Sequence, residues 1–141
     1  MLRRSEYEAL VYSLTARFPE IRLSTLVVAP TAYSMAHVTG MIAFGEDIVL
    51  CIHELVDFRQ GCILSYRYEV TRSIPPFVEK ALPSADEYCA VHYAGKEKLY
   101  WYDSQPHPDS RTLQSTHPHH KHIPPDIKHN RIPAPGLSFT T

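Results

Sequence analysis

The sequence is poor in cysteine and glycine, and the pattern of its few cysteines argues against two classes of small protein. It has 141 residues, of which 3 are cysteine and 5 are glycine. Cys51, Cys62 and Cys89 are odd in number, widely spaced and without a CxxC pair, which argues against a disulfide framework and against a zinc ribbon. We expect all three to be small, buried hydrophobic side chains in a protein of a reducing compartment.

Long apolar segments are absent too. The first residues include two arginines but no apolar stretch follows them, so no signal peptide is indicated. No apolar run approaches the roughly 18 residues that a membrane span needs. We therefore expect a cytoplasmic protein with no membrane partner.

The sequence also lacks a strong net charge. Lys and Arg total 14 against 15 Asp and Glu, a formal charge of −1, so no overall field would recruit nucleic acid from a distance and any basic patch must be local. By contrast, 9 histidines, 9 tyrosines and 12 prolines are present. The hydrophobic share of 44% and the length indicate one globular domain.

Hydrophobic periodicity predicts an α+β fold. A possible capping box at Ser5 and Glu8, followed by apolar residues at helical spacing up to Pro19, predicts a helix over residues 5–18. The pattern then changes to that of strands, with turns at 45–47 and 57–61. The strands predicted in this part of the chain are residues 26–28, 36–44, 48–56 and 62–71.

The second half is broken by proline. We expect a short helix over Phe77–Leu82 and an aromatic hairpin made of Tyr88–Tyr93 and Leu99–Asp103. Short turns imply an antiparallel meander, curved and of about five to six strands, with the N-terminal helix packed on it. Residues 1–103 would form this core, and 104–141 would be a His/Pro-rich loop segment laid on the same domain.

The densest chemical signal lies in that segment, which holds 7 of the 12 prolines and 6 of the 9 histidines. If the backbone is extended, His120 and His122 point one way, and His119 and Lys121 the other. As a nuclease site, one neutral histidine would deprotonate an RNA 2′-hydroxyl and a protonated one would donate to the leaving oxygen, while Lys121 or Arg111 stabilises the phosphate. This chemistry needs no cofactor.

Two other readings stay open for the same histidines. Three imidazoles, with Asp103, could hold a divalent metal such as zinc, although no usual zinc spacing such as HExxH occurs. They could also be solvated side chains of a polar tail. No glycine-rich phosphate loop, nucleophile elbow or paired-carboxylate motif is visible, so ATP hydrolysis, ester hydrolysis and glycoside cleavage lack support.

Residues outside the segment could assist. Several aromatic side chains could stack bases, although we favour a core role for them. Basic side chains on strand faces and turns could contact phosphates. His53 and Glu54 lie inside an apolar strand, where the histidine is either a partly buried side chain with satisfied hydrogen bonds or a general base. The aromatic residues are Tyr66, Tyr68, Tyr100, Trp101 and Tyr102, and the basic ones are Arg67, Arg72, Lys96 and Lys98.

Two motifs near the C-terminus resemble a known family. The run Tyr100-Trp101-Tyr102-Asp103-Ser104-Gln105-Pro106-His107-Pro108 is followed by Thr116-His117-Pro118-His119-His120-Lys121-His122. Together they are similar to the signature of the TumE-like toxins of prokaryotic toxin-antitoxin systems, which reads as aromatic-aromatic-Asp-x-x-Pro-His, a spacer, and Pro-His-His-Lys-His. A weaker similarity extends back through the meander.

The resemblance implies a toxin encoded beside an antitoxin that carries a helix-turn-helix-like DNA-binding domain, with a target in the RNA or translation machinery. The matching positions, which we take as catalytic candidates, are Asp103, His107, His119, His120, Lys121 and His122. Arg67, Arg111, Lys128 and Arg131 are the nucleic-acid-binding candidates. A metal-independent ribonuclease or translation inhibitor is the first hypothesis. A non-catalytic interaction module and a metal-binding protein are the alternatives, and a homodimer stays open.

Overall fold

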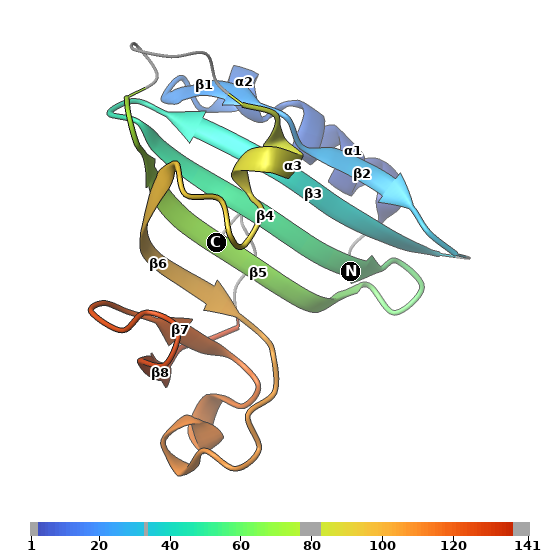
Figure 1. Ribbon diagram of the computed structural model, residues 1–141. Helices are drawn as coiled ribbons and strands as arrows, with labels where there is room; N and C mark the ends of the chain where they lie inside the picture. The colour runs from blue at the N-terminus through green and yellow to red at the C-terminus, as the bar shows by residue number, and fades with distance from the viewer. Residues whose placement is uncertain (1–2, 33, 77–82, 137–141) are drawn as a thin grey trace.

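The computed structural model describes residues 3–32, 34–76 and 83–136, and it is built around one antiparallel sheet (Figure 1). The eight strands follow the order β1-β3-β4-β5-β6-β7-β8, and β2 also pairs with β3. The strands are β1 Ile21–Ser24, β2 Val27–Pro30, β3 Met35–Phe44, β4 Ile48–Asp57, β5 Cys62–Ser73, β6 Lys96–Asp103, β7 His120–His122 and β8 Arg131–Pro133. The predicted α+β class is confirmed.

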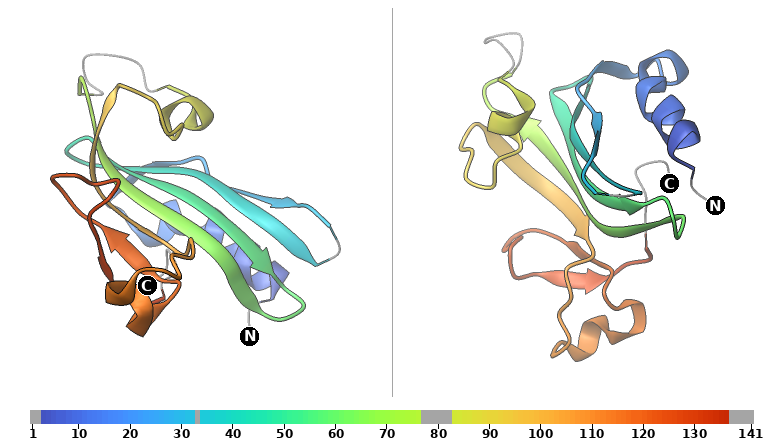
Figure 2. Two further views of the ribbon diagram at one scale, coloured as in Figure 1. Left: turned by 60° about the horizontal axis from the view of Figure 1, so that its bottom comes forward. Right: turned by 90° about the vertical axis from the view of Figure 1, so that its right-hand side faces the viewer.

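The helices are short and lie on both faces of the sheet. They are α1 Arg4–Tyr12, α2 Leu14–Arg17, α3 Ala85–Tyr88 and the 3-10 helix η2 Arg111–Thr116. Figure 2 shows α1 and α2 against one face and α3 against the other. The two faces are called the α1 face and the α3 face below. No helix in the described part of the chain is long and apolar enough to cross a membrane.

The alternation of side chains along the strands separates two cores. On the α1 face, Tyr7, Val11 and Leu14 of the helices pack against even-numbered strand residues such as Ile52 and Tyr68. On the α3 face, Tyr88 packs against odd-numbered strand residues, Met41, Ala43, Val49 and Cys51. The long central strands β3, β4 and β5 are therefore buried on both sides over much of their length.

The first helix departs from its prediction. It divides into α1 and α2 at Ser13, and no side chain caps α1, which begins after Arg3 and not at a capping box on Ser5. Ser13 instead uses its hydroxyl to bond the Leu10 carbonyl oxygen, 3.2 Å away. A serine that bonds the preceding helical turn competes with the helix, which is consistent with a break there.

Two predictions for the middle of the chain are wrong. Residues 88–93 form no strand: Tyr88 ends α3, and its ring is buried on the α3 face. Cys51 and Cys89 form a disulfide, although their separation of 38 residues gave no sign of it, because β4 and the end of α3 bring their Cα atoms to 5.8 Å. Cys62 is free. The helix predicted over 77–82 lies outside the described residues.

The His/Pro-rich segment contributes strands and is not only a loop. β7 pairs with β6, and β8 pairs with β7, so the sheet continues through residues 120–133. With β1 and β2 these short strands raise the count above the five to six expected. Prolines flank both of them, and a three-residue strand leaves too little alternation to recognise in a sequence.

Candidate functional site

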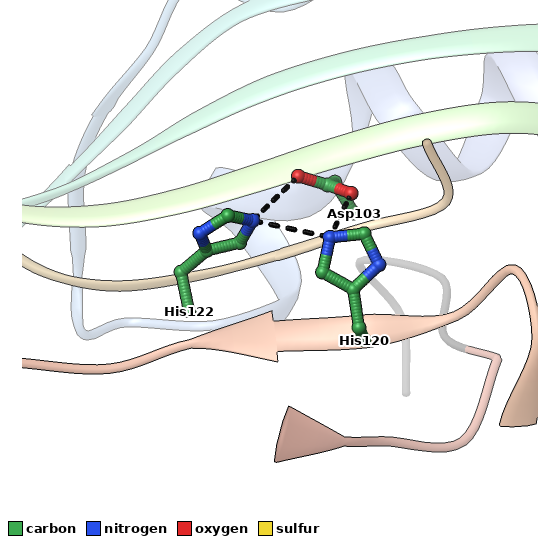
Figure 3. Close-up of side chains that lie close together, drawn as sticks. All are labelled: Asp103, His120 and His122. Carbon is green, nitrogen blue, oxygen red and sulfur yellow. Dashed lines mark hydrogen bonds and ion pairs between the residues drawn. The ribbon is translucent and has the colours of Figure 1, made fainter. Parts of the chain in front are cut away.

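Three side chains meet where β6 ends beside β7. Asp103 is the last residue of β6 and lies opposite His120 in the antiparallel register, while Trp101 lies opposite His122. Paired residues of neighbouring strands project to the same face, so Asp103, His120 and His122 all lie on the α3 face (Figure 3). Their exposed fractions are 8%, 1% and 4%. This group is called the Asp-His-His cluster below.

The distances within the cluster are those of direct polar contacts. The Nε2 atom of His120 lies 2.7 Å from Asp103 Oδ1, and Nε2 of His122 lies 3.3 Å from Asp103 Oδ2. The two Nε2 atoms are 3.1 Å apart. The prediction that His120 and His122 share one face is confirmed by this contact.

Backbone carbonyls hold the other nitrogen of each ring. Nδ1 of His120 lies 3.0 Å from the Pro118 oxygen, and Nδ1 of His122 lies 2.7 Å from the Ile127 oxygen. A carbonyl only accepts, so each Nδ1 carries a proton and donates it. In the neutral rings both Nε2 lone pairs then point at the same small space as the carboxylate. Three buried electron-pair donors repel one another, so a proton or another cation between them would stabilise the cluster.

Two further donors fix the Asp103 carboxylate. Trp101 Nε1 donates to Oδ2 at 2.9 Å, and the Gln105 backbone N–H donates to Oδ1 at 3.0 Å. Burial of this carboxyl opposes its ionisation, but the hydrogen bonds from His122 and Trp101 and the charge of His120 outweigh burial, so its pKa lies below the usual value. The Trp101 ring also stacks on His122, with centroids 4.0 Å apart.

His107 lies beside the cluster, in the connection between β6 and η2. Its ring meets the His120 ring edge to face, with centroids 4.8 Å apart. Burial lowers the pKa of His107, and the positive charges of Arg131 and His120 lower it further. Burial likewise lowers the pKa of His120. His107 therefore lies against the Asp-His-His cluster, as its position in the first motif suggested.

A pocket of about 420 Å³ opens beside the cluster. Asp103, His107 and His122 form part of its wall. Four basic side chains line it as well, against the single carboxylate of Asp103, although the chain as a whole has a formal charge of −1. The basic residues are Arg67, Lys98, Lys128 and Arg131, which come from β5, β6, the β7–β8 connection and β8. The sequence left room only for a local basic patch, and these four side chains form one.

Two of these cations are already engaged by a buried carboxylate. Glu69 on β5 is 3% exposed and lies 2.7 Å from Arg67 Nη2 and 3.8 Å from Lys98 Nζ. Arg67 and Lys98 also lie over the Trp101 ring. Arg131, by contrast, has a buried Nε atom with no hydrogen-bond partner among the residues that the structure describes. It is therefore the pocket cation best placed to gain from a bound anion.

Several predicted residues lie away from this pocket. Lys121 is on the α1 face, over the rings of Tyr100 and Tyr102 at 4.5 and 5.1 Å. His119 stacks on Tyr66, and its Nδ1 lies 2.9 Å from that hydroxyl. Arg111 is exposed on η2 and does not line the pocket. Among the aromatic residues, Tyr66, Tyr68 and Trp101 are buried, as a core role requires.

Other side chains have a different position from the one that their candidate role required, or line the pocket without having been named as candidates. Lys96, considered as a phosphate contact, is buried, with Nζ 2.8 Å from Glu69 Oε1. Glu54 is fully buried on the α1 face and accepts hydrogen bonds from Tyr7 and Tyr68, while His53 is exposed on the other face. Gln105 and His92 line the pocket but were not singled out in the sequence, because only long-range pairing brings them to His122.

The cluster also has the chemistry of a metal site. Within the described residues, Asp103, His120 and His122 form a group whose potential ligand atoms all lie within 4.8 Å of one another. With a proton between the nitrogens it can hold and release that proton, and with an ion it can polarise a bound oxygen. Both activities would act on a group seated in the basic pocket.

Comparison with known proteins gives one family. The chain matches no curated protein and no solved structure. A family model described as "Toxin TumE" matches residues 12–140, which include all the strands and the whole of the site. The resemblance found in the two motifs is thus confirmed over almost the full length, and the chain belongs to the TumE toxin family.

Proposed function

We propose that this toxin acts by cleaving RNA in the basic pocket, and that a cognate antitoxin is its protein partner. The observation that carries the proposal is that Asp103 and His122 of the buried Asp-His-His cluster lie, with His107, in the wall of a pocket lined by four basic side chains. Basic side chains around a site that handles charge favour an anionic substrate. Family membership supports the toxin role, and the site supports the choice of RNA.

The reaction that fits these groups is an internal transesterification. The 2′-oxygen attacks the adjacent phosphorus, the P–O5′ bond breaks, and a 2′,3′-cyclic phosphate and a 5′-hydroxyl result. His107, in the pocket wall, takes the proton of the 2′-hydroxyl. The positive charge of the cluster stabilises the leaving 5′-oxygen. That oxygen then receives the proton that His107 took, and His107 returns to its neutral form. Arg131, Lys128 and Arg67 bind the flanking phosphates.

The test follows RNA in vitro and growth in cells together. Purified wild type should fragment total RNA, and its expression should arrest a growing bacterium. His107→Ala should reduce cleavage by about 100-fold or more, the usual contribution of one acid-base group, and should relieve the arrest. His129→Ala is the matched control, because its side chain is 66% exposed and pairs only with Asp126 among the contacts described.

Three results would contradict the proposal. Growth arrest with intact RNA would place the target in translation without cleavage, and equal cleavage by wild type and His107→Ala would remove that residue from the reaction. Absence of both arrest and RNA fragmentation, in a folded protein, would favour the non-catalytic interaction module.

A further inference from the structure

We propose that Asp103, His120 and His122 bind one divalent transition-metal ion, of which Zn²⁺ is the representative, and that this ion is the positive charge of the site. The role of the ion in cleavage rests on the proposed function. Its binding does not, because binding is argued only from the geometry of the cluster.

The first support is the direction of the free lone pairs. The carbonyls of Pro118 and Ile127 hold both Nδ1 protons at 3.0 and 2.7 Å, which leaves Nε2 of each ring as the free donor atom. This arrangement, with the second ring nitrogen bonded to a carbonyl, is the usual one for histidines that ligate a metal. A single proton could satisfy one Nε2 atom, whereas an ion satisfies both together with the carboxylate.

The second support is the spacing of the donor atoms. Zinc bonds of about 2.0–2.1 Å in a tetrahedron separate neighbouring ligand atoms by about 3.3 Å. The two Nε2 atoms lie 3.1 Å apart, and Nε2 of His122 lies 3.3 Å from Asp103 Oδ2. The contact between His120 Nε2 and Asp103 Oδ1 is shorter, at 2.7 Å, so coordination through Oδ2 needs only a small rotation of the carboxylate.

The third support is that the ligands are held in advance. All three residues are less than a tenth exposed. The Trp101 ring stacks on His122, and its Nε1 donates to Asp103 Oδ2, so one side chain positions two of the ligands. The Gln105 N–H holds the other carboxylate oxygen. Such outer contacts orient ligands and raise their affinity for a metal.

The ligand set selects the class of ion. Two imidazoles and one carboxylate suit zinc and the divalent ions of iron, cobalt and nickel, whereas magnesium and calcium prefer a shell made of oxygen. Three protein ligands leave at least one coordination position for an oxygen from water or substrate. Asp103 and His122 line the basic pocket, so a phosphate oxygen bound there is the natural occupant of that position.

Metal binding is measured on the untagged chain after dialysis against a chelator. Titration with Zn²⁺ should give one ion per chain by calorimetry and by elemental analysis, and Mg²⁺ should give no comparable binding. Asp103→Asn and His122→Asn should each weaken zinc binding by at least about 10-fold. His129→Ala should bind like wild type, because its exposed ring lies outside the cluster.

A second measurement needs no variant, in case a buried substitution prevents folding. Cobalt bound to the wild-type chain should give the visible absorption of a four- or five-coordinate site, and Zn²⁺ should displace it. No zinc binding at pH 7.5, or unchanged affinity in the folded Asp103→Asn and His122→Asn variants, would overturn the metal site. An octahedral cobalt spectrum that zinc does not alter would overturn it as well.

The two proposals fail separately. One zinc ion per chain with intact RNA would retain the metal site and reject cleavage. Full cleavage by metal-free protein in excess chelator would retain cleavage and reject the ion as its charge, which leaves the shared proton in that role. Loss of cleavage in chelator that zinc restores would support both.

Discussion

The two faces of the sheet each bury a carboxylate, and the partners of the two carboxylates differ. On the α1 face Glu54 is fully buried and accepts hydrogen bonds from the hydroxyls of Tyr7 and Tyr68. On the α3 face Asp103 meets the Nε2 atoms of His120 and His122. The Nδ1 proton of each ring is donated to a backbone carbonyl and points away from the carboxylate. Glu54 has donors supplied by the core, whereas Asp103 lies beside lone pairs.

This difference separates a structural role from a chemical one. Glu54 links α1 to β4 and β5 under a layer of apolar side chains, and it is not among the residues that line the basic pocket. A buried polar group with satisfied partners fixes a fold but offers nothing to a substrate. Asp103 lines the basic pocket and lies beside two ring nitrogens that a cation would stabilise. The proposal of a reactive site rests on these partners, and not on burial itself.

The largest expected effect comes from Asp103→Asn. An amide cannot balance the positive charge of the cluster, so RNA cleavage should fall by about 100-fold or more, a fall larger than any loss of folded protein seen in the circular dichroism spectrum and the unfolding midpoint. Initial cleavage rates and thermal unfolding of the same preparation measure both. Full activity in the folded variant would contradict this, because Asp103 would then have a structural role like that of Glu54.

Tyr68→Phe should have the opposite outcome. Removal of the hydroxyl takes a donor from the buried Glu54 carboxylate, which should lower the free energy of unfolding by about 1–3 kcal/mol. Cleavage at 25 °C should stay within twofold of wild type. Denaturant unfolding supplies the first quantity and an RNA assay the second. A loss of cleavage larger than the loss of folded protein would contradict the separation of the faces.

Arg131→Gln sharpens the description of the pocket. Its buried Nε has no hydrogen-bond partner among the described residues, so we expect the side chain to contact a phosphate of the RNA. Binding should weaken severalfold, and the slope of the logarithm of affinity against the logarithm of salt should fall by about one. Filter binding or fluorescence anisotropy at several salt concentrations measures it. The exposed Arg111→Gln serves as the control and should leave the slope unchanged.

The smallest effect concerns His53, on the α3 face of β4. Desolvation by the surrounding protein lowers the pKa of this largely exposed histidine below 6.5, and the nearby positive charges of His37 and Arg67 lower it further. The unfolded chain then binds a proton more readily, so folding stability is full above pH 6.5 and falls as the pH decreases towards the folded pKa. His53→Gln should show a smaller fall in unfolding free energy between pH 7 and pH 5.5. An identical fall in both proteins would contradict this.

Much of the sheet follows from alternation in the sequence. The long strands β3, β4 and β5 were predicted because apolar residues recur at a period of two between turns, and the same period placed His120 and His122 together. The strand predicted over Tyr88–Tyr93 was wrong because aromatic residues occur in strands and in short helices alike. Here Tyr88 is buried against the sheet as the last residue of the helix α3.

The site itself was only partly visible. Two motifs gave the four residues at the pocket or beside it, which are Asp103, His107, His120 and His122. Their separation from His119 and Lys121 could be predicted only on the condition that the backbone is extended there. The pairing of Arg67 with Asp103, and the return of β8 that brings Arg131 to the pocket, are long-range contacts. So is the disulfide between Cys51 and Cys89. Local pattern carries no information about such distances.

The pairing of β6 with β7 has a consequence for changes in chain length. Asp103 and His120 are fixed opposite each other by sheet register, while the residues between them form a connection that contains η2. Added or lost residues around Arg111–Thr116 should alter the connection and spare the cluster. One residue inserted between His120 and His122 would move the two rings to opposite faces. Length variation should thus be tolerated between the motifs and be destructive within the second one.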